Sequence, residues 1–68
     1  MDSREIFALN LRKQYGRSLL SKAEAAKELT ISRATIDRMR KEGEIKSQKI
    51  GQQIRFNVKE IARVVISL

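Results

Sequence analysis

The side chains of this chain that can take part in chemistry are cations and amides. The sequence contains neither histidine nor cysteine. Zinc sites of the usual nitrogen and sulfur kind, and Ser/His or Cys/His nucleophile pairs, depend on those residues. We therefore expect no enzyme, no metal and no cofactor. Fifteen Lys and Arg residues against eight Asp and Glu residues give a net charge of +7 at pH 7 in 68 residues. This excess favours a polyanionic partner, either nucleic acid or an acidic membrane surface.

The basic excess lies mainly in one part of the chain. Residues 1–31 hold six basic and four acidic residues, residues 32–59 hold eight and three, and residues 60–68 hold one of each. The net charges of these segments are therefore +2, +5 and 0. A chain this short forms one small domain without room for a deep enclosed pocket. We expect the polyanion to bind the surface that residues 32–59 form.

Helical periodicity begins near the first residue. Apolar residues recur at i, i+4 from Phe7 to Tyr15, which predicts an amphipathic helix over Ser3–Tyr15. Asp2 or Ser3 can cap its start, and the glycine that follows Tyr15 can end it in a left-handed conformation.

Two further helices are predicted on either side of a short turn. Ser21 and Glu24 have the spacing of a capping box, which predicts a helix over Lys22–Leu29. The turn Thr30-Ile31-Ser32 follows, and its serine can cap a third helix over residues 33–42. The glycine at position 43 ends that helix.

The periodicity changes after this glycine. Residues 46–50 and 53–56 read as two short strands around Gly51-Gln52, a loop compatible with a type II′ turn. Ile50, Ile54 and Phe56 are expected to complete the core from this hairpin. A final helix follows, capped by an asparagine, and its inner face is predicted from its apolar residues Val58, Ile61, Ala62, Val65 and Ile66.

Residues 25–39 fit a helix-turn-helix better than a generic helical hairpin. Ala26 is small where the two helices must cross, and the turn has the three residues that set a steep angle between them. Thr30 stands where most examples have glycine, so it must adopt the backbone geometry that the turn demands. The expected fold is mainly α with a small β-hairpin, a winged helix-turn-helix in the order helix, helix, helix, hairpin, helix.

The third helix offers one face to a groove of DNA. Ile36 and Met39 face inward on it, so the opposite side is expected to face solvent. The major groove admits an α-helix, and Arg can pair bidentately with a guanine edge there, which makes Arg38 the best candidate for base reading. Ala34 can lie against a thymine methyl group. The DNA contacts expected from this helix are Ser32, Arg33, Ala34, Thr35, Asp37, Arg38 and Lys41.

Three of these positions have specific interpretations. Ser32 and Arg33 suggest a phosphate clamp, because a helix N-terminus presents free amides and a cation in the first turn favours an anion there. Asp37 can accept from a cytosine amine, or it can hold Arg38 or Lys41 in an ion pair. The sequence leaves these two roles open.

The hairpin supplies the remaining candidates. Lys49, Gln52, Gln53 and Arg55 lie near its turn, and such a wing can lie along a phosphate backbone or in the minor groove. For the two glutamines, a solvated hairpin without a DNA contact is an equal alternative.

A longer pattern resembles a known family. Residues 19–39, together with Glu42-Gly43-Glu44-Ile45, Lys49-Ile50-Gly51 and Ile54-Arg55-Phe56, are similar to the excisionase-type, MerR-like winged helix-turn-helix module. The similarity covers roughly residues 19–66. Members of that family are small DNA-binding proteins of bacteria, phages and plasmids. They include excisionases that act as recombination directionality factors, transcriptional regulators, and DNA-binding domains of larger recombinases.

The resemblance implies a division of the chain and a set of partners. Residues 33–42 correspond to the recognition helix of the family and the turn around Gly51 to its wing. The family often has two basic residues after that glycine, where this chain has Gln52 and Gln53, so the charge of the wing rests on Lys49 and Arg55. Residues 1–18 form a helix outside the resemblance, and residues 19–68 form the domain. Double-stranded DNA is the implied partner, and a recombinase, an integrase or further copies of this chain can act with it.

Three kinds of function remain open. The leading one is an excisionase-like factor or a small transcriptional regulator. If the chain ends at Leu68 it has no long dimerising helix, which favours the excisionase-like role. The second is a DNA-recognition module of a recombinase or of a phage packaging protein that resembles small terminase subunits. The least favoured is a membrane-surface or protein-interaction module built on Ser3–Tyr15. Without a signal peptide or a long apolar segment, we expect a cytoplasmic protein of bacterial, phage or plasmid origin.

Overall fold

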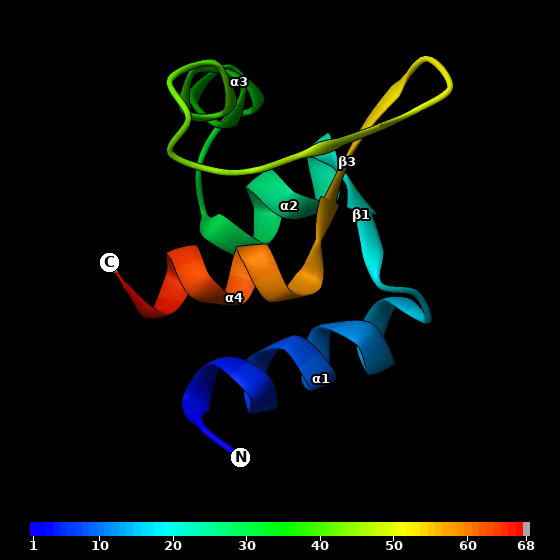
Figure 1. Cartoon of the computed structure of the whole chain (residues 1–68), viewed down its shortest axis with the longest axis vertical. Coiled ribbons are helices and arrows are strands. Elements are labelled where there is room, and N and C mark those ends of the chain that lie inside the picture. Colours follow the sequence, from blue (N-terminus) through cyan, green and yellow to red (C-terminus); the bar gives the residue numbers. More distant parts are fainter. Residues whose placement is uncertain (68) are drawn as a thin grey trace.

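The computed structural model describes residues 1–67, and four helices and three short strands follow one another there (Figure 1). The mainly helical fold class with a small β-hairpin, consistent with a winged helix-turn-helix, is confirmed. The elements are α1 (Ser3–Tyr15), β1 (Leu19–Ser21), α2 (Lys22–Leu29), α3 (Arg33–Lys41), β2 (Gln48–Ile50), β3 (Gln53–Asn57) and α4 (Val58–Ile66).

Strand β1 was not predicted. It makes the hairpin into a three-stranded antiparallel sheet of order β1-β3-β2, in which Leu20 of β1 lies opposite Phe56 of β3. Three residues are too few to show the alternation that identifies a strand. The partner strand also comes much later in the chain, so only the folded structure reveals the pairing.

The hairpin, which we call the wing (residues 48–57), has the predicted two-residue loop. Ile50 pairs with Gln53, and Gly51 between them has a φ of 62°, as the first central position of a type II′ turn requires. The first strand starts at Gln48 rather than at residue 46. The prediction that Ile50 completes the core is wrong, because this residue is 54% exposed on the edge strand β2.

The predicted helix starts are confirmed by their hydrogen bonds. Glu24 N donates to Ser21 Oγ at 3.1 Å and Ser21 N donates to Glu24 Oε1 at 2.9 Å, which completes the capping box of α2. Side chains of Asp2, Ser32 and Asn57 accept from the first turns of α1, α3 and α4.

Glu60 follows the cap residue Asn57 by three positions, the spacing of a capping box, but its carboxylate has a different role. Glu60 in the first turn of α4 accepts from Lys46 N at 2.9 Å and lies 2.7 Å from Arg63 Nη2. Its carboxylate therefore holds the connection between α3 and β2 against α4.

Helices α2 and α3 end in the same hydrogen-bond pattern, but the residue in the left-handed conformation differs between them. After α2, Ile31 N donates to Ala26 O at 3.0 Å, and after α3, Glu44 N donates to Met39 O at 2.8 Å. This pattern needs a left-handed residue just past the helix. Gly43 supplies it after α3 with a φ of 77°, whereas Thr30 supplies it after α2 with a φ of 60°. The β-branched Thr30 is therefore strained where a glycine would not be.

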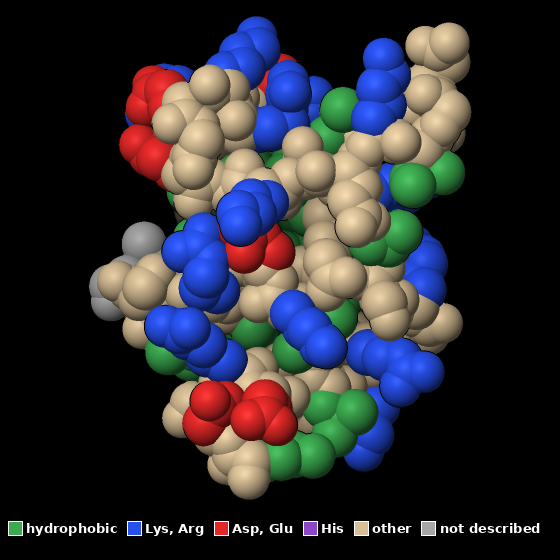
Figure 2. All heavy atoms as spheres, viewed as in Figure 1, with side chains coloured by type: hydrophobic (Ala, Val, Ile, Leu, Met, Phe, Trp, Pro, Cys, Tyr) green, Lys and Arg blue, Asp and Glu red, His purple; other side chains and the backbone are tan. Residues whose placement is uncertain are grey.

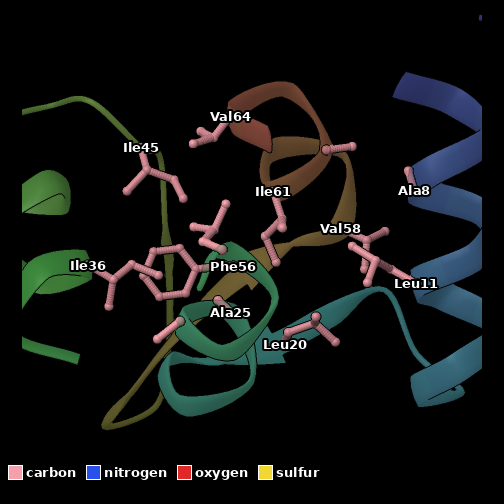
Figure 3. Packing of buried hydrophobic residues seen from close by; sticks show 13 residues of the cluster. Ala8, Leu11, Leu20, Ala25, Ile36, Ile45, Phe56, Val58, Ile61 and Val64 are labelled. Carbon is pink, nitrogen blue, oxygen red and sulfur yellow. The ribbon is translucent and has the colours of Figure 1, made fainter. Parts of the chain in front are cut away.

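The core gathers around the middle strand. The largest fully buried side chains are Phe56, Leu20, Ile36, Ile45 and Ile61. Figure 3 shows the Phe56 ring beside Ile36 of α3, so the wing strand and the third helix share one packed centre.

The inner face of α4 differs in part from the prediction. Val58, Ile61 and Ala62 are buried as expected, but Val64 is buried as well and Ile66 is 43% exposed. Val64 lies near Ile45 in Figure 3, because the irregular connection after α3 covers that side of α4. Helical periodicity in the sequence cannot predict that an irregular segment from elsewhere in the chain will cover one side of the helix.

Helix α1 packs chiefly against α4, at the opposite end of the molecule from α3 and the turn of the wing (Figure 1). Its buried side chains are Ala8 and Leu11, and both lie toward Val58 of α4 in Figure 3. At the other end of α1, the Tyr15 hydroxyl donates to Glu28 of α2. Helix α1 therefore contributes to the same core as the rest of the chain.

Replacing Thr30 by glycine should stabilise the protein, because glycine adopts a positive φ without a steric penalty. We expect a gain of about 1 kcal/mol in the free energy of unfolding, which raises Tm by about 4–8 °C in a domain of this size. Thermal unfolding followed by circular dichroism measures this.

Gly43→Ala is the matched control for Thr30→Gly. A Cβ at Gly43 would meet nothing within 4 Å, so this change reports backbone strain alone and should lower Tm. A Thr30→Gly protein no more stable than the parent would show that Thr30 carries no strain.

Candidate nucleic-acid interface

Helix α3 and the turn of the wing project from the same end of the molecule (Figure 1). Ile36 is fully buried and anchors α3 to the core. With 100° between successive residues, Ala34, Arg38 and Lys41 lie within about 40° of the direction opposite Ile36. All three side chains are exposed, as the sequence predicts.

Arg38 lies on this outward face with a weak partner. Its Nη1 is 3.4 Å from Glu42 Oε2, and the two side chains are 58% and 49% exposed. Exposed pairs of this (i, i+4) kind contribute only about 0.3–0.5 kcal/mol. The guanidinium group can therefore leave Glu42 for a stronger acceptor at small cost.

Asp37 does not pair with Arg38 or Lys41, so that expectation is wrong. Its Oδ1 lies 2.9 Å from Lys22 Nζ and 2.9 Å from Arg40 Nη2. These hydrogen bonds, that of Lys22 foremost, lower the pKa of Asp37 to about 2. Asp37 lies about 100° from Ile36 around the helix, on the flank that faces the start of α2. The carboxylate thus joins α2 to α3.

The start of α3 combines a cap with a free cation. Ser32 Oγ accepts from Thr35 N at 3.1 Å and lies 2.9 Å from Thr35 Oγ1, so both hydroxyl groups belong to the cap. Arg33 is exposed and has no ion pair within residues 1–67. The predicted phosphate clamp therefore has an accessible cation beside the positive end of the helix.

The four residues of the wing that were predicted to contact DNA differ in their exposure and in their hydrogen bonds. Lys49, Gln52 and Gln53 are exposed, and Lys49 forms no ion pair in the part of the chain that the structure describes. Arg55 is half-buried, and its Nη2 donates to Gln53 Oε1. Figure 2 shows Lys and Arg side chains over both α3 and the wing at this end.

Lys22 and Arg40 are two residues at this end that the sequence did not indicate. They fix Asp37 from the start of α2 and from the next turn of α3. Sequence spacing could have suggested Arg40, which lies at i+3 from Asp37. Nothing in the sequence pairs Lys22 with Asp37, because their contact depends on the angle between two helices.

The two helices, their three-residue turn and the wing define a winged helix-turn-helix domain. A family model described as a helix-turn-helix domain matches residues 19–65, and the chain belongs to this family. The match leaves α1 outside it. Comparisons with curated proteins and with solved structures find no match. The family suggests DNA binding, and its domains are typically non-catalytic.

Within residues 1–67 there is no helix that combines the length and the apolar character needed to cross a membrane.

Asp37→Asn should lower Tm, because the carboxylate binds Lys22 of α2 and Arg40 of α3. We expect it to leave the preferred DNA sequence unchanged, since these contacts already engage the carboxylate. Thermal unfolding and a comparison of binding to several duplexes measure the two effects. Glu42→Gln, which removes the weaker pair of α3, is the control and should change Tm less. A changed base preference in Asp37→Asn with an unchanged Tm would restore the base-reading role.

Proposed function

We propose that this protein binds duplex DNA without catalysing a reaction, with α3 in the major groove and the wing on the backbone or in the minor groove. One observation carries the proposal. Four exposed cations, Arg33, Arg38, Lys41 and Lys49, lie on the two elements that project from one end. Of these four, only Arg38 has a carboxylate partner in the part of the chain that the structure describes.

The residues of α3 take different parts in this proposal. Arg38 reads a guanine, because it lies on the outward face and its bond to Glu42 is weak. Arg33 and the first turn of α3 bind a phosphate, since the free amides and the cation favour an anion there. Ala34 is small and exposed, so it lets the helix approach the bases and can contact a thymine methyl group.

The wing contributes less charge than the helix. Lys49 forms no ion pair among residues 1–67, whereas Arg55 is engaged with Gln53. Gln52 lies at the exposed tip beside Gly51, where its amide can reach the acceptors of the minor groove. The wing is therefore proposed to position the protein, and α3 to supply most of the sequence preference.

The biological role proposed for this DNA binding is that of an excisionase-like recombination directionality factor or a small transcriptional regulator. The resemblance of residues 19–66 to excisionase-type modules supports it. The position of α1 also supports it, because this helix lies away from α3 and the wing and leaves a surface for a recombinase or for a neighbouring copy. A recognition module of a recombinase or of a packaging protein is the alternative.

Arg38→Ala should relax sequence preference, since a bidentate contact contributes about 1–3 kcal/mol of discrimination against the wrong base. Arg33→Ala should weaken binding to all duplexes alike and reduce the slope of log affinity against log salt by about 1. Titrations of preferred and unrelated duplexes at several salt concentrations measure both. Lys13→Ala, an exposed cation of α1, is the matched control and should change little. Equal losses on both duplexes for Arg38→Ala would remove Arg38 as a base reader.

Selection of preferred duplexes from a random pool, at two salt concentrations, should return a defined site at both. An excisionase-like role predicts that the selected site bends when bound and that adjacent sites fill cooperatively. Gel mobility of circularly permuted fragments and titration of tandem sites measure this. Independent binding to single, unbent sites would favour the role of a transcriptional regulator. A pool without an enriched sequence would show that the protein binds DNA only through non-specific electrostatic attraction.

A further inference from the structure

A second basic surface lies away from α3. An open groove of about 920 Å³ lies between α1 and the first turn of α4, and residues 46–48 form part of its border. Its cations are Arg4, Arg12, Lys46, Lys59 and Arg63. We call this surface the basic groove. Figure 2 shows Lys and Arg side chains over α1 and α4 in the lower half of the view.

The floor of the basic groove is apolar. Ala8 and Val58 line it where α1 packs on α4, and both are buried. Leu9 lines it as well, but it is half-buried and does not belong to the core cluster of the described residues. Leu9 is thus an apolar side chain that a ligand in the groove could cover.

The carboxylates of the basic groove are mostly engaged within the fold. Glu60 is bound by Arg63 and by the backbone of Lys46, and these contacts hold its pKa below the usual value. Asp2 accepts from Glu5 N at 2.9 Å as the cap of α1.

The balance of charge in the groove is positive. Four cations, Arg4, Arg12, Lys46 and Lys59, have no ion pair within residues 1–67. The side chain of Glu5 is the one carboxylate of the groove that neither caps a helix nor joins a salt bridge there. A ligand that complements the groove must therefore carry negative charge.

We propose that the basic groove binds an acidic, amphipathic segment of a partner protein. Acidic side chains of the segment pair with the cations of the basic groove, and apolar side chains of the segment cover Leu9. A DNA duplex is a poorer fit, because its convex backbone presents phosphates and would leave Leu9 uncovered. The groove lies away from α3 and from the turn of the wing, so the partner and DNA can bind at the same time. The proposal does not depend on the DNA-binding role.

A designed peptide tests the proposal on the whole chain. The probe is a fluorescein-labelled helical peptide of about 15 residues with Glu on one face and Leu on the other, and a scrambled peptide of the same composition is its control. Fluorescence anisotropy gives the affinity, and amide chemical shifts locate the peptide. We expect shifts at Leu9, Arg12 and Lys59 and none in α3, with much weaker binding of the scrambled peptide.

Matched variants separate charge from the apolar floor. Arg12→Glu combined with Lys59→Glu should weaken peptide binding about tenfold, whereas Lys13→Glu, next to Arg12 but outside the groove, should change it less than about twofold. Leu9→Gln should weaken it several-fold without a change of charge. Duplex affinity of the Leu9→Gln variant should equal that of the parent, which separates this proposal from the proposed DNA binding.

Three results would overturn the proposal. Peptide shifts confined to α3 or the wing would place the peptide on the other basic surface. The groove would be a general polyanion site if Leu9→Gln left the peptide affinity unchanged and if the scrambled peptide, or a duplex, bound the groove as tightly as the designed peptide. A dimer of the parent that Arg12→Glu dissociates would identify a second copy as the occupant. If the protein with both charge reversals does not fold, the peptide affinities of the single variants Leu9→Gln and Lys59→Gln, both at accessible positions, test the proposal in the same way.

Discussion

The central strand β3 is the constraint on which the rest of the structure depends. It pairs with β1 on one side and β2 on the other, and its Phe56 is fully buried opposite a fully buried Leu20. Strand β1 leads directly into α2 and β3 leads directly into α4, so this pairing sets where both helices begin. Helix α3 packs chiefly against α2, and its buried Ile36 lies beside the Phe56 ring of β3 (Figure 3). In a chain with so little core, α3 and the wing are therefore held in relation to each other by α2 and by the core around Phe56.

The charges of the protein divide into structural and free groups. Glu24, Asp37 and Glu60 are engaged in contacts that close a cap, join α2 to α3 and hold the connection before β2. The cations that bind them are likewise committed to the fold. Most of the remaining basic side chains lie at the α3 and wing end or around the basic groove, whereas Lys13 of α1 and Lys27 of α2 do not line the groove. The excess of basic residues, which gives the net charge of +7, therefore lies mainly on two separate surfaces of the molecule.

How far the sequence predicts this protein depends on the range of each interaction. Ser21 and Ser32 cap helices as predicted, and Gly43 ends one, because these hydrogen bonds connect residues three to five positions apart. The contact of Asp37 with Lys22 and the exposure of Ile50 were missed. Both depend on how elements distant in sequence meet, which periodicity does not report.

By itself, the sequence determined the order of the helices, their caps, the two-residue turn of the wing and the outward face of α3, because all of these follow from local hydrogen bonds and helical periodicity. The tertiary structure alone decided that Leu19–Ser21 forms a strand, that Asp37 joins two helices and that α1 closes a basic groove against α4. Each of these depends on contacts between segments that are far apart in the chain, which local hydrogen bonds and periodicity do not report.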